Sequence, residues 1–183
     1  MIRTLFHSRR AFIALVFLML TSCNTKASRE WCFQANLTAR PCYNGGRIFL
    51  EAEREYDYLE IEIVRSRSGI RFYLNILFLQ AMPCLEDLTK AKVEVIFENE
   101  EEPWIIYSLI LRGGQRLLLP TEVSNYLIQV LSEGQSFEFK VGNYHTKAIP
   151  ETFEERYQAL MKINIEENGL INQRETLLQS FRG

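Results

Sequence analysis

Residues 58–79 read YLEIEIVRSRSGIRFYLNILFL, and this stretch determines the fold class that the sequence predicts. In residues 59–63 apolar side chains occupy every second position, as in a strand with one buried face. A polar segment, 65–69, follows, and its last residue, Gly69, supplies the backbone freedom of a turn. The apolar segment 70–79 then predicts a longer strand, paired with the first as an antiparallel hairpin with a five-residue loop.

The same pattern recurs along most of the chain. Further strands are predicted at 47–53, 92–98, 104–111, 116–119, 135–141 and 144–149. One helix is predicted to begin with Thr121 as its N-cap and to end at Gly134, and a second covers 150–162. Short turns between successive strands favour antiparallel pairing. The sequence therefore predicts a mainly β domain of seven to nine strands, an antiparallel sandwich or partly open barrel, with two or three short helices.

Four glutamates on predicted strands alternate with apolar residues. They are Glu60, Glu62, Glu94 and Glu138. We expect these side chains to face solvent, where their charge keeps exposed strands of different molecules from pairing.

Composition limits the class of protein. The 183 residues suit one ordinary domain, and 47% hydrophobic residues indicate a folded core rather than disorder. The formal net charge is −2 and no basic patch is evident, which argues against a nucleic-acid partner.

The first 23 residues have the order of a secretion signal. Three arginines precede an uninterrupted apolar run at 11–20. A membrane-spanning helix needs about 20 apolar residues, so this run has the length of a signal-peptide core instead. The run ends in Leu-Thr-Ser-Cys at 20–23, which resembles the lipobox of bacterial lipoproteins. A segment at 8–13 also resembles a twin-arginine export motif, but the strongly apolar core favours the general secretory route.

The lipoprotein resemblance implies a specific modification. The chain would be cut between Ser22 and Cys23, and Cys23 would become an N-palmitoyl, S-diacylglyceryl cysteine that holds the protein to a membrane of the bacterial envelope. Asn24, in place of an aspartate, favours the outer membrane over the inner one. The alternatives are a plain cleaved signal peptide and an uncleaved anchor. Loss of three arginines with residues 1–22 lowers the net charge from −2 to −5, so lipid rather than protein charge would hold the domain there.

We expect four segments along the chain. They are a lipoprotein signal peptide at 1–22, a tether at 23–30, a β-rich globular domain at 31–163 and a polar, weakly helical tail at 164–183.

Three cysteines remain in an oxidising compartment. Cys32 and Cys42 are separated by nine residues and form the expected disulfide, which would contribute about 2.5–3 kcal/mol in the chain-entropy model. Cys84 is then unpaired, either as a small, apolar, buried thiol or as a site for pairing with another chain.

A second resemblance is fainter. The Leu-Leu-Leu-Pro run at 117–120, the apolar positions at 126–131, Phe137-Glu138-Phe139, Phe153 and Ala159-Leu160 follow one another in the order found in invasion-associated-locus-type periplasmic proteins. The Trp31-Cys32 opening with Cys42 is also similar. That family usually carries a second cysteine pair before the helix, which this chain lacks. The resemblance implies a β-sandwich with a role in host association and no catalytic residues.

Residues for catalysis or metal binding are sparse. His145 is the one histidine downstream of the signal segment, and we expect it to be structural or solvated rather than catalytic. No metal site and no cofactor site is predicted. The acidic residues Glu98 and 100–102 are expected at a solvated hairpin tip, with calcium binding as the alternative. Five aromatic residues are expected in the core, with a ligand groove as the alternative; they are Tyr56, Tyr58, Phe72, Tyr73 and Phe78.

Three functions are compatible with these features. The leading one is a lipoprotein that acts by contact, without catalysis, as a structural or assembly component or at a host-facing surface. The second is a carrier that holds a small apolar ligand within the β-domain. The third is a hydrolase that uses His145 or a pair of carboxylates.

Overall fold

The computed structural model describes residues 29–36, 45–52, 59–163 and 165. The strands are β1 (Cys32–Asn36), β2 (Gly45–Leu50), β3 (Leu59–Ser66), β4 (Gly69–Ile76), β5 (Lys90–Phe97), β6 (Trp104–Ile110), β7 (Arg116–Leu118), β8 (Phe137–Val141) and β9 (Tyr144–Ala148). The helices are α2 (Thr121–Ser132) and α3 (Phe153–Met161). The predicted signal peptide 1–22, Cys23, Cys42 and the tail beyond residue 165 lie outside the described residues.

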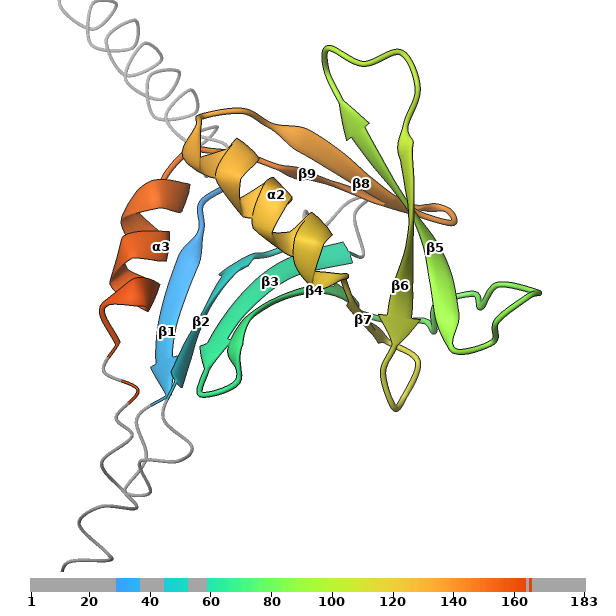
Figure 1. Ribbon diagram of the computed structural model, residues 1–183, viewed down its shortest axis with the longest axis horizontal. Helices are drawn as coiled ribbons and strands as arrows, with labels where there is room; N and C mark the ends of the chain where they lie inside the picture. Colours follow the sequence, from blue (N-terminus) through green and yellow to red (C-terminus); the bar gives the residue numbers. More distant parts are fainter. Residues whose placement is uncertain (1–28, 37–44, 53–58, 164, 166–183) are drawn as a thin grey trace, which may run out of the picture.

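All nine strands form one open antiparallel sheet in the order β1-β2-β3-β4-β7-β6-β5-β8-β9 (Figure 1). The predicted mainly β, antiparallel class is therefore confirmed. Most strands that are adjacent in the chain pair with each other, including β3 with β4 and β5 with β6, but β4 does not pair with β5 and β7 does not pair with β8. The pairs β4–β7 and β5–β8 join segments far apart in sequence, and they turn separate hairpins into a single sheet.

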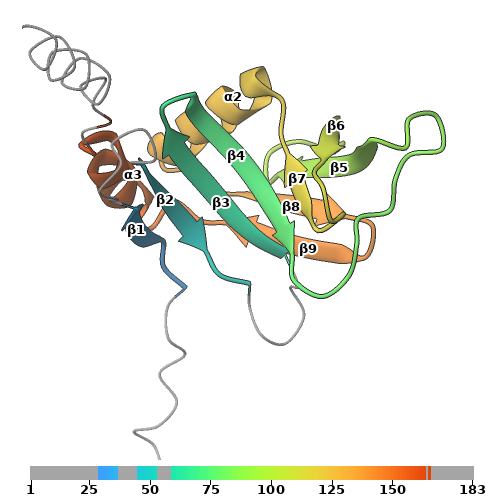
Figure 2. The same cartoon turned by 90° about the horizontal axis from the view of Figure 1, so that it is seen from below.

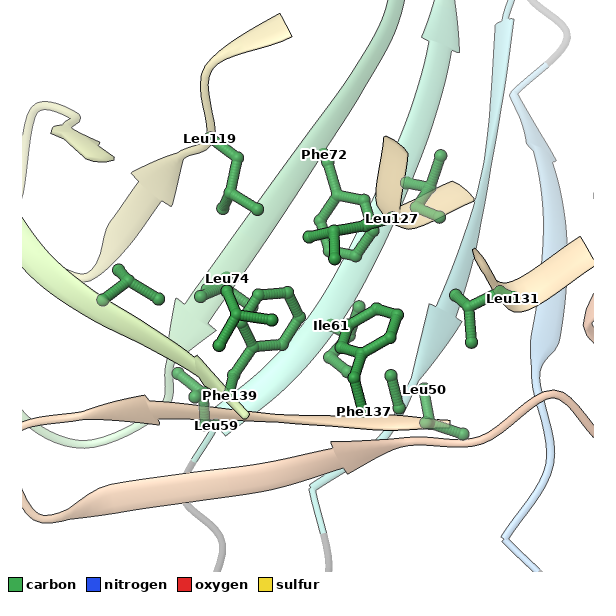
Figure 3. Close-up of a cluster of buried hydrophobic side chains, with 14 of the residues drawn as sticks. Leu50, Leu59, Ile61, Phe72, Leu74, Leu119, Leu127, Leu131, Phe137 and Phe139 are labelled. Carbon is green, nitrogen blue, oxygen red and sulfur yellow. The ribbon is translucent and has the colours of Figure 1, made fainter. Parts of the chain in front are cut away.

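The sheet curls strongly, so that its last strand, β9, contacts β3. The curl encloses the apolar face, where side chains from β3, β4, β8 and α2 meet (Figure 3). Phe72 and Phe139 pack edge to face with ring centroids 5.6 Å apart, and both are fully buried. The space between the sheet and α2 is thus filled with protein side chains.

Two helices cover the edges of this core. Leu127 and Leu131 of α2 pack into the cluster of Figure 3, and α3 packs on β1 and β2. The predicted helix bounds agree closely with the structure, but the expected N-cap is wrong. Pro120 is the cap of α2, because its extended backbone places its carbonyl oxygen 2.9 Å from the Ser124 amide nitrogen. Thr121 is instead the first residue of the helix.

The β3–β4 hairpin is tighter than predicted. Ser66 and Gly69 are paired in the register, so two residues, Arg67 and Ser68, form the loop rather than five. Gly69 has φ = +103°, a conformation that side chains larger than hydrogen disfavour. The β5–β6 hairpin tip has the predicted position, and Glu100 to Glu102 are exposed there.

Glu62 departs from the predicted row of solvent-facing glutamates. The register places it on the outer face of the sheet with Glu60, yet only 5% of Glu62 is exposed. Arg47 on β2 and Arg116 on β7 donate to its carboxylate at 3.1 Å and 2.6 Å. Asn75 joins this cluster at 3.0 Å. Glu62 is therefore a buried structural charge in the middle of the sheet rather than a surface charge at an edge.

Candidate functional site

The loop between β4 and β5 presents an unusual set of apolar side chains. Its large exposed residues are Leu77, Phe78, Leu79, Met82, Leu85 and Leu88. Leu85 is 100% exposed and Met82 is 83% exposed. We call residues 77–89 the apolar loop; it extends from the end of the sheet toward the right of Figure 2. Exposed apolar side chains concentrated in this way mark surfaces that bind proteins, membranes or ligands.

The apolar loop contradicts the predicted strand at 70–79, which ends at Ile76 instead. The register partner of Ile76 is Leu59, the first residue of β3. From there the chain follows the Gly113-Gly114 turn, with the Ala81 amide donating to the Gly114 carbonyl oxygen at 2.7 Å. Phe78, expected in the core with the other aromatic residues, is consequently 70% exposed.

Asp87 fixes the end of the apolar loop where it joins β5. Its Oδ1 accepts from the Thr89 hydroxyl at 2.6 Å and from the Thr89 amide at 3.0 Å, and Oδ2 lies 3.0 Å from Lys90 Nζ. Hydrogen bonding from the Thr89 side chain, followed by that from Lys90, lowers the pKa of Asp87 from 3.8 to about 2. This junction is therefore held by an ionised carboxylate throughout the neutral range.

These hydrogen bonds predict the pH at which the Asp87 carboxylate becomes protonated. Because its pKa is depressed in the folded state, the stabilisation it gives is complete above pH 3.8 and is lost as the pH falls toward about 2. A carboxyl-carbon NMR titration should show a midpoint near 2 for Asp87. In Thr89→Ala the midpoint should rise toward 3.8. A wild-type midpoint already at 3.8 would contradict this description of the junction.

The outer face of β6 continues the apolar surface of the loop. Ile105, Tyr107 and Leu109 alternate along the strand and are 43%, 53% and 43% exposed. The Ile110 amide donates to the Thr89 carbonyl oxygen at 2.8 Å, which joins this end of β6 to the loop. We call Ile105, Tyr107 and Leu109 the β6 strip.

A hollow of about 810 Å³ lies between the apolar loop and the outer face of the sheet. Apolar residues of the loop form one wall, including Leu79, Met82, Pro83 and Leu85. The opposite wall contains Tyr107 from the β6 strip, together with Lys92, Glu94, Lys140 and the β8–β9 turn at 141–144. Its volume falls within the range of small-molecule sites, about 300–1,000 Å³.

The polar wall of the hollow is a compact charge cluster. Glu94 lies between two lysines, with Lys92 Nζ at 2.8 Å from Oε1 and Lys140 Nζ at 3.7 Å from Oε2. The hydrogen bond from Lys92 lowers the pKa of Glu94, and the same bond raises the pKa of Lys92. The cluster thus contains two basic side chains around one acid. Glu86 on the loop side of the hollow adds a second acid to the lining.

Only some of the cysteines with a predicted role lie among the described residues. Cys42 lies outside the described residues, so the Cys32–Cys42 disulfide stays a prediction, and so does lipidation at Cys23. Cys32 begins β1, and its Sγ is 3.9 Å from the Glu30 carbonyl oxygen. Cys84 is half-buried and is one of the residues that line the hollow.

The other polar residues considered for catalysis or metal binding do not come together in one site. His145 is exposed on the outer face of β9, opposite Lys140 in the register. Glu98 pairs with Lys147 at 2.6 Å and accepts from Ser136 at 3.0 Å, and the bond from Lys147 lowers its pKa. Over the described part of the chain, no three His, Cys, Asp or Glu side chains are grouped to hold a metal ion.

No protein-family model, no curated protein and no solved structure matches this chain. Among the residues that the structure describes, no helix is long and apolar enough to cross a membrane.

Proposed function

We propose that this chain is a bacterial envelope lipoprotein, anchored through lipid on Cys23, that acts by contact and without catalysis. The lipobox-like 20–23 segment supports the anchor, and Asn24 favours the outer membrane. The partner is an envelope component or a host protein within reach of the anchored domain.

The observation that carries this proposal is the exposure of the apolar loop. Burying a side chain such as leucine or methionine is worth about 1.5–3 kcal/mol, so leaving six of them exposed forgoes substantial stability. The loop is nevertheless bonded to its surroundings through Ala81, Cys84 and Thr89. A surface that is both apolar and held in shape is typical of a preformed contact site.

The contact can be tested with photo-crosslinking residues introduced at single positions in intact cells. Phe78 on the apolar loop and Leu109 on the β6 strip should give the same discrete adduct. Ser68, exposed at the β3–β4 turn, serves as the matched control and should give little of it. Adducts of equal yield at Ser68, or none at either apolar position, would contradict the proposed contact surface.

A carrier of a small amphipathic or apolar ligand is the second candidate, supported by the hollow of about 810 Å³. The hollow lies on the outer face, whereas the interior of the curled sheet is packed with side chains (Figure 3). A carrier function would therefore use the apolar loop as a flap over the sheet rather than a cavity inside it.

A further inference from the structure

We propose that the hollow under the apolar loop binds an amphipathic anion, a single hydrocarbon chain that ends in a carboxylate or a phosphate. The anionic head would lie at Lys140 and Lys92, and the chain would run along Leu79, Met82 and Leu85. This inference names the ligand class of the carrier proposal and is independent of the anchor at Cys23.

The two walls of the hollow match the two parts of such a molecule. Leu85 and Met82, 100% and 83% exposed, would lose part of their contact with water against a hydrocarbon chain. Across the hollow the charged groups lie on three neighbouring outer-face positions, since Glu94 is paired with Lys140 in the register and Lys92 precedes it by two residues. The separation of apolar from charged lining favours an amphiphile over a wholly apolar or wholly polar ligand.

Lys140 is the lysine with capacity for a ligand. Lys92 is already engaged with Glu94 at 2.8 Å, whereas Lys140 is 3.7 Å from the same carboxylate and 50% exposed at its side chain. An ammonium group has three donors, so Lys140 retains donors for an incoming anion. Lys92 and Lys140 are balanced by Glu94 and Glu86 in the lining of the hollow, so the attraction for a negatively charged head is local to Lys140.

Glu86 also borders the hollow and has the opposite effect on an anion. Its side chain is exposed, and among the described residues it forms no ion pair with Lys92 or Lys140. A negative charge at this border repels an anionic head, so removing it should strengthen binding. Removing the charge of Glu86 and removing the charge of Lys140 should therefore change the binding of an anion in opposite directions.

The experiment uses the full chain in phosphatidylcholine vesicles, a photoactivatable diazirine palmitate as the probe and the matching diazirine hexadecanol as the uncharged control. Peptide mapping should find the palmitate label on residues 79–86 and Tyr107, with clearly less label from the alcohol. Lys140→Met should lower that label about threefold to fivefold, as for loss of one partly exposed ion pair. Glu86→Gln should raise it.

Lys147→Met is the matched control for the lysine, because Lys147 is equally exposed and pairs with Glu98 outside the hollow. Its label should equal that of the wild type. Equal labelling by the alcohol, or unchanged labelling in Lys140→Met, would overturn the proposal. Label spread equally onto Phe78 and Leu88, which do not line the hollow, would show bilayer contact by the loop instead.

Discussion

Replacing Trp31 with alanine should lower the free energy of unfolding by about 3–5 kcal/mol, the cost of removing a large aromatic side chain from a packed core. Trp31 is 1% exposed, and its ring packs edge to face on Phe153 with centroids 5.1 Å apart. Its Nε1 donates to the Ile149 carbonyl oxygen at 2.7 Å, and its amide donates to Thr152 Oγ1 at 3.1 Å. This one residue therefore holds the start of the domain to α3 and to the segment after β9.

Chemical denaturation followed by circular dichroism measures this effect, and the other tryptophan supplies the control. Trp104 is 38% exposed and stacks on Tyr126 at 5.0 Å, so Trp104→Ala should cost distinctly less. Trp31→Phe keeps an aromatic ring but loses the hydrogen bond to Ile149. Its loss of unfolding free energy should lie between those of Trp31→Ala and Trp104→Ala. If Trp31→Ala and Trp104→Ala cost the same, the packing described for Trp31 is wrong.

Replacing Glu62 with alanine has the second largest expected effect, about 2–4 kcal/mol of destabilisation, because it leaves two arginines without their shared carboxylate. Arg116 also stacks over the Tyr73 ring at 3.8 Å, and its Nε is buried with no hydrogen-bond partner among the described residues. The estimate stays below that for a fully buried pair, since the side chains of Arg47 and Arg116 are 33% and 40% exposed.

Glu60 on the same strand and face is the control for Glu62. It accepts from Asn75 at 2.7 Å, so Glu60→Ala removes one partly exposed hydrogen bond and should cost about 1 kcal/mol. A double-mutant cycle of Glu62→Ala with Arg116→Met measures the coupling directly. A cost for Glu62→Ala no larger than that for Glu60→Ala would show that the charge cluster adds little to stability.

Much of the fold could be predicted because its local patterns are strong. The period of two in β3 and the glycine turns place most strands within a few residues of their observed ends. The pairs β4–β7 and β5–β8 join distant segments, and nothing in the local pattern of either strand specifies its partner. β1 was not separately predicted because its exposed residues show no apolar alternation, and burial of its neighbour Trp31 comes from α3.

The candidate site was harder to predict than the fold. Leu77, Phe78 and Leu79 extend the apolar run of β4, and sequence alone does not distinguish a buried run from one that leaves the sheet. Lys92 and Lys140 are 48 positions apart in the chain and meet only through the β5–β8 pairing. Glu62 carried no sequence signal for burial, because its two arginines come from strands on either side of the β3–β4 hairpin. Alternation of Glu60 and Glu62 with apolar residues correctly predicted their outward direction.

The lipid anchor at Cys23 is the central claim, because it sets the proposed location of this protein at a membrane, where the proposed contact function takes place. Metabolic labelling with palmitate, followed by intact mass measurement and membrane fractionation, tests it in wild type beside Cys23→Ser. The account predicts that the wild-type chain carries the label, has lost residues 1–22 and sediments with membranes. It predicts that Cys23→Ser carries no label and is lost from the membrane fraction. A wild-type chain without lipid, or label that persists in Cys23→Ser, would contradict the account.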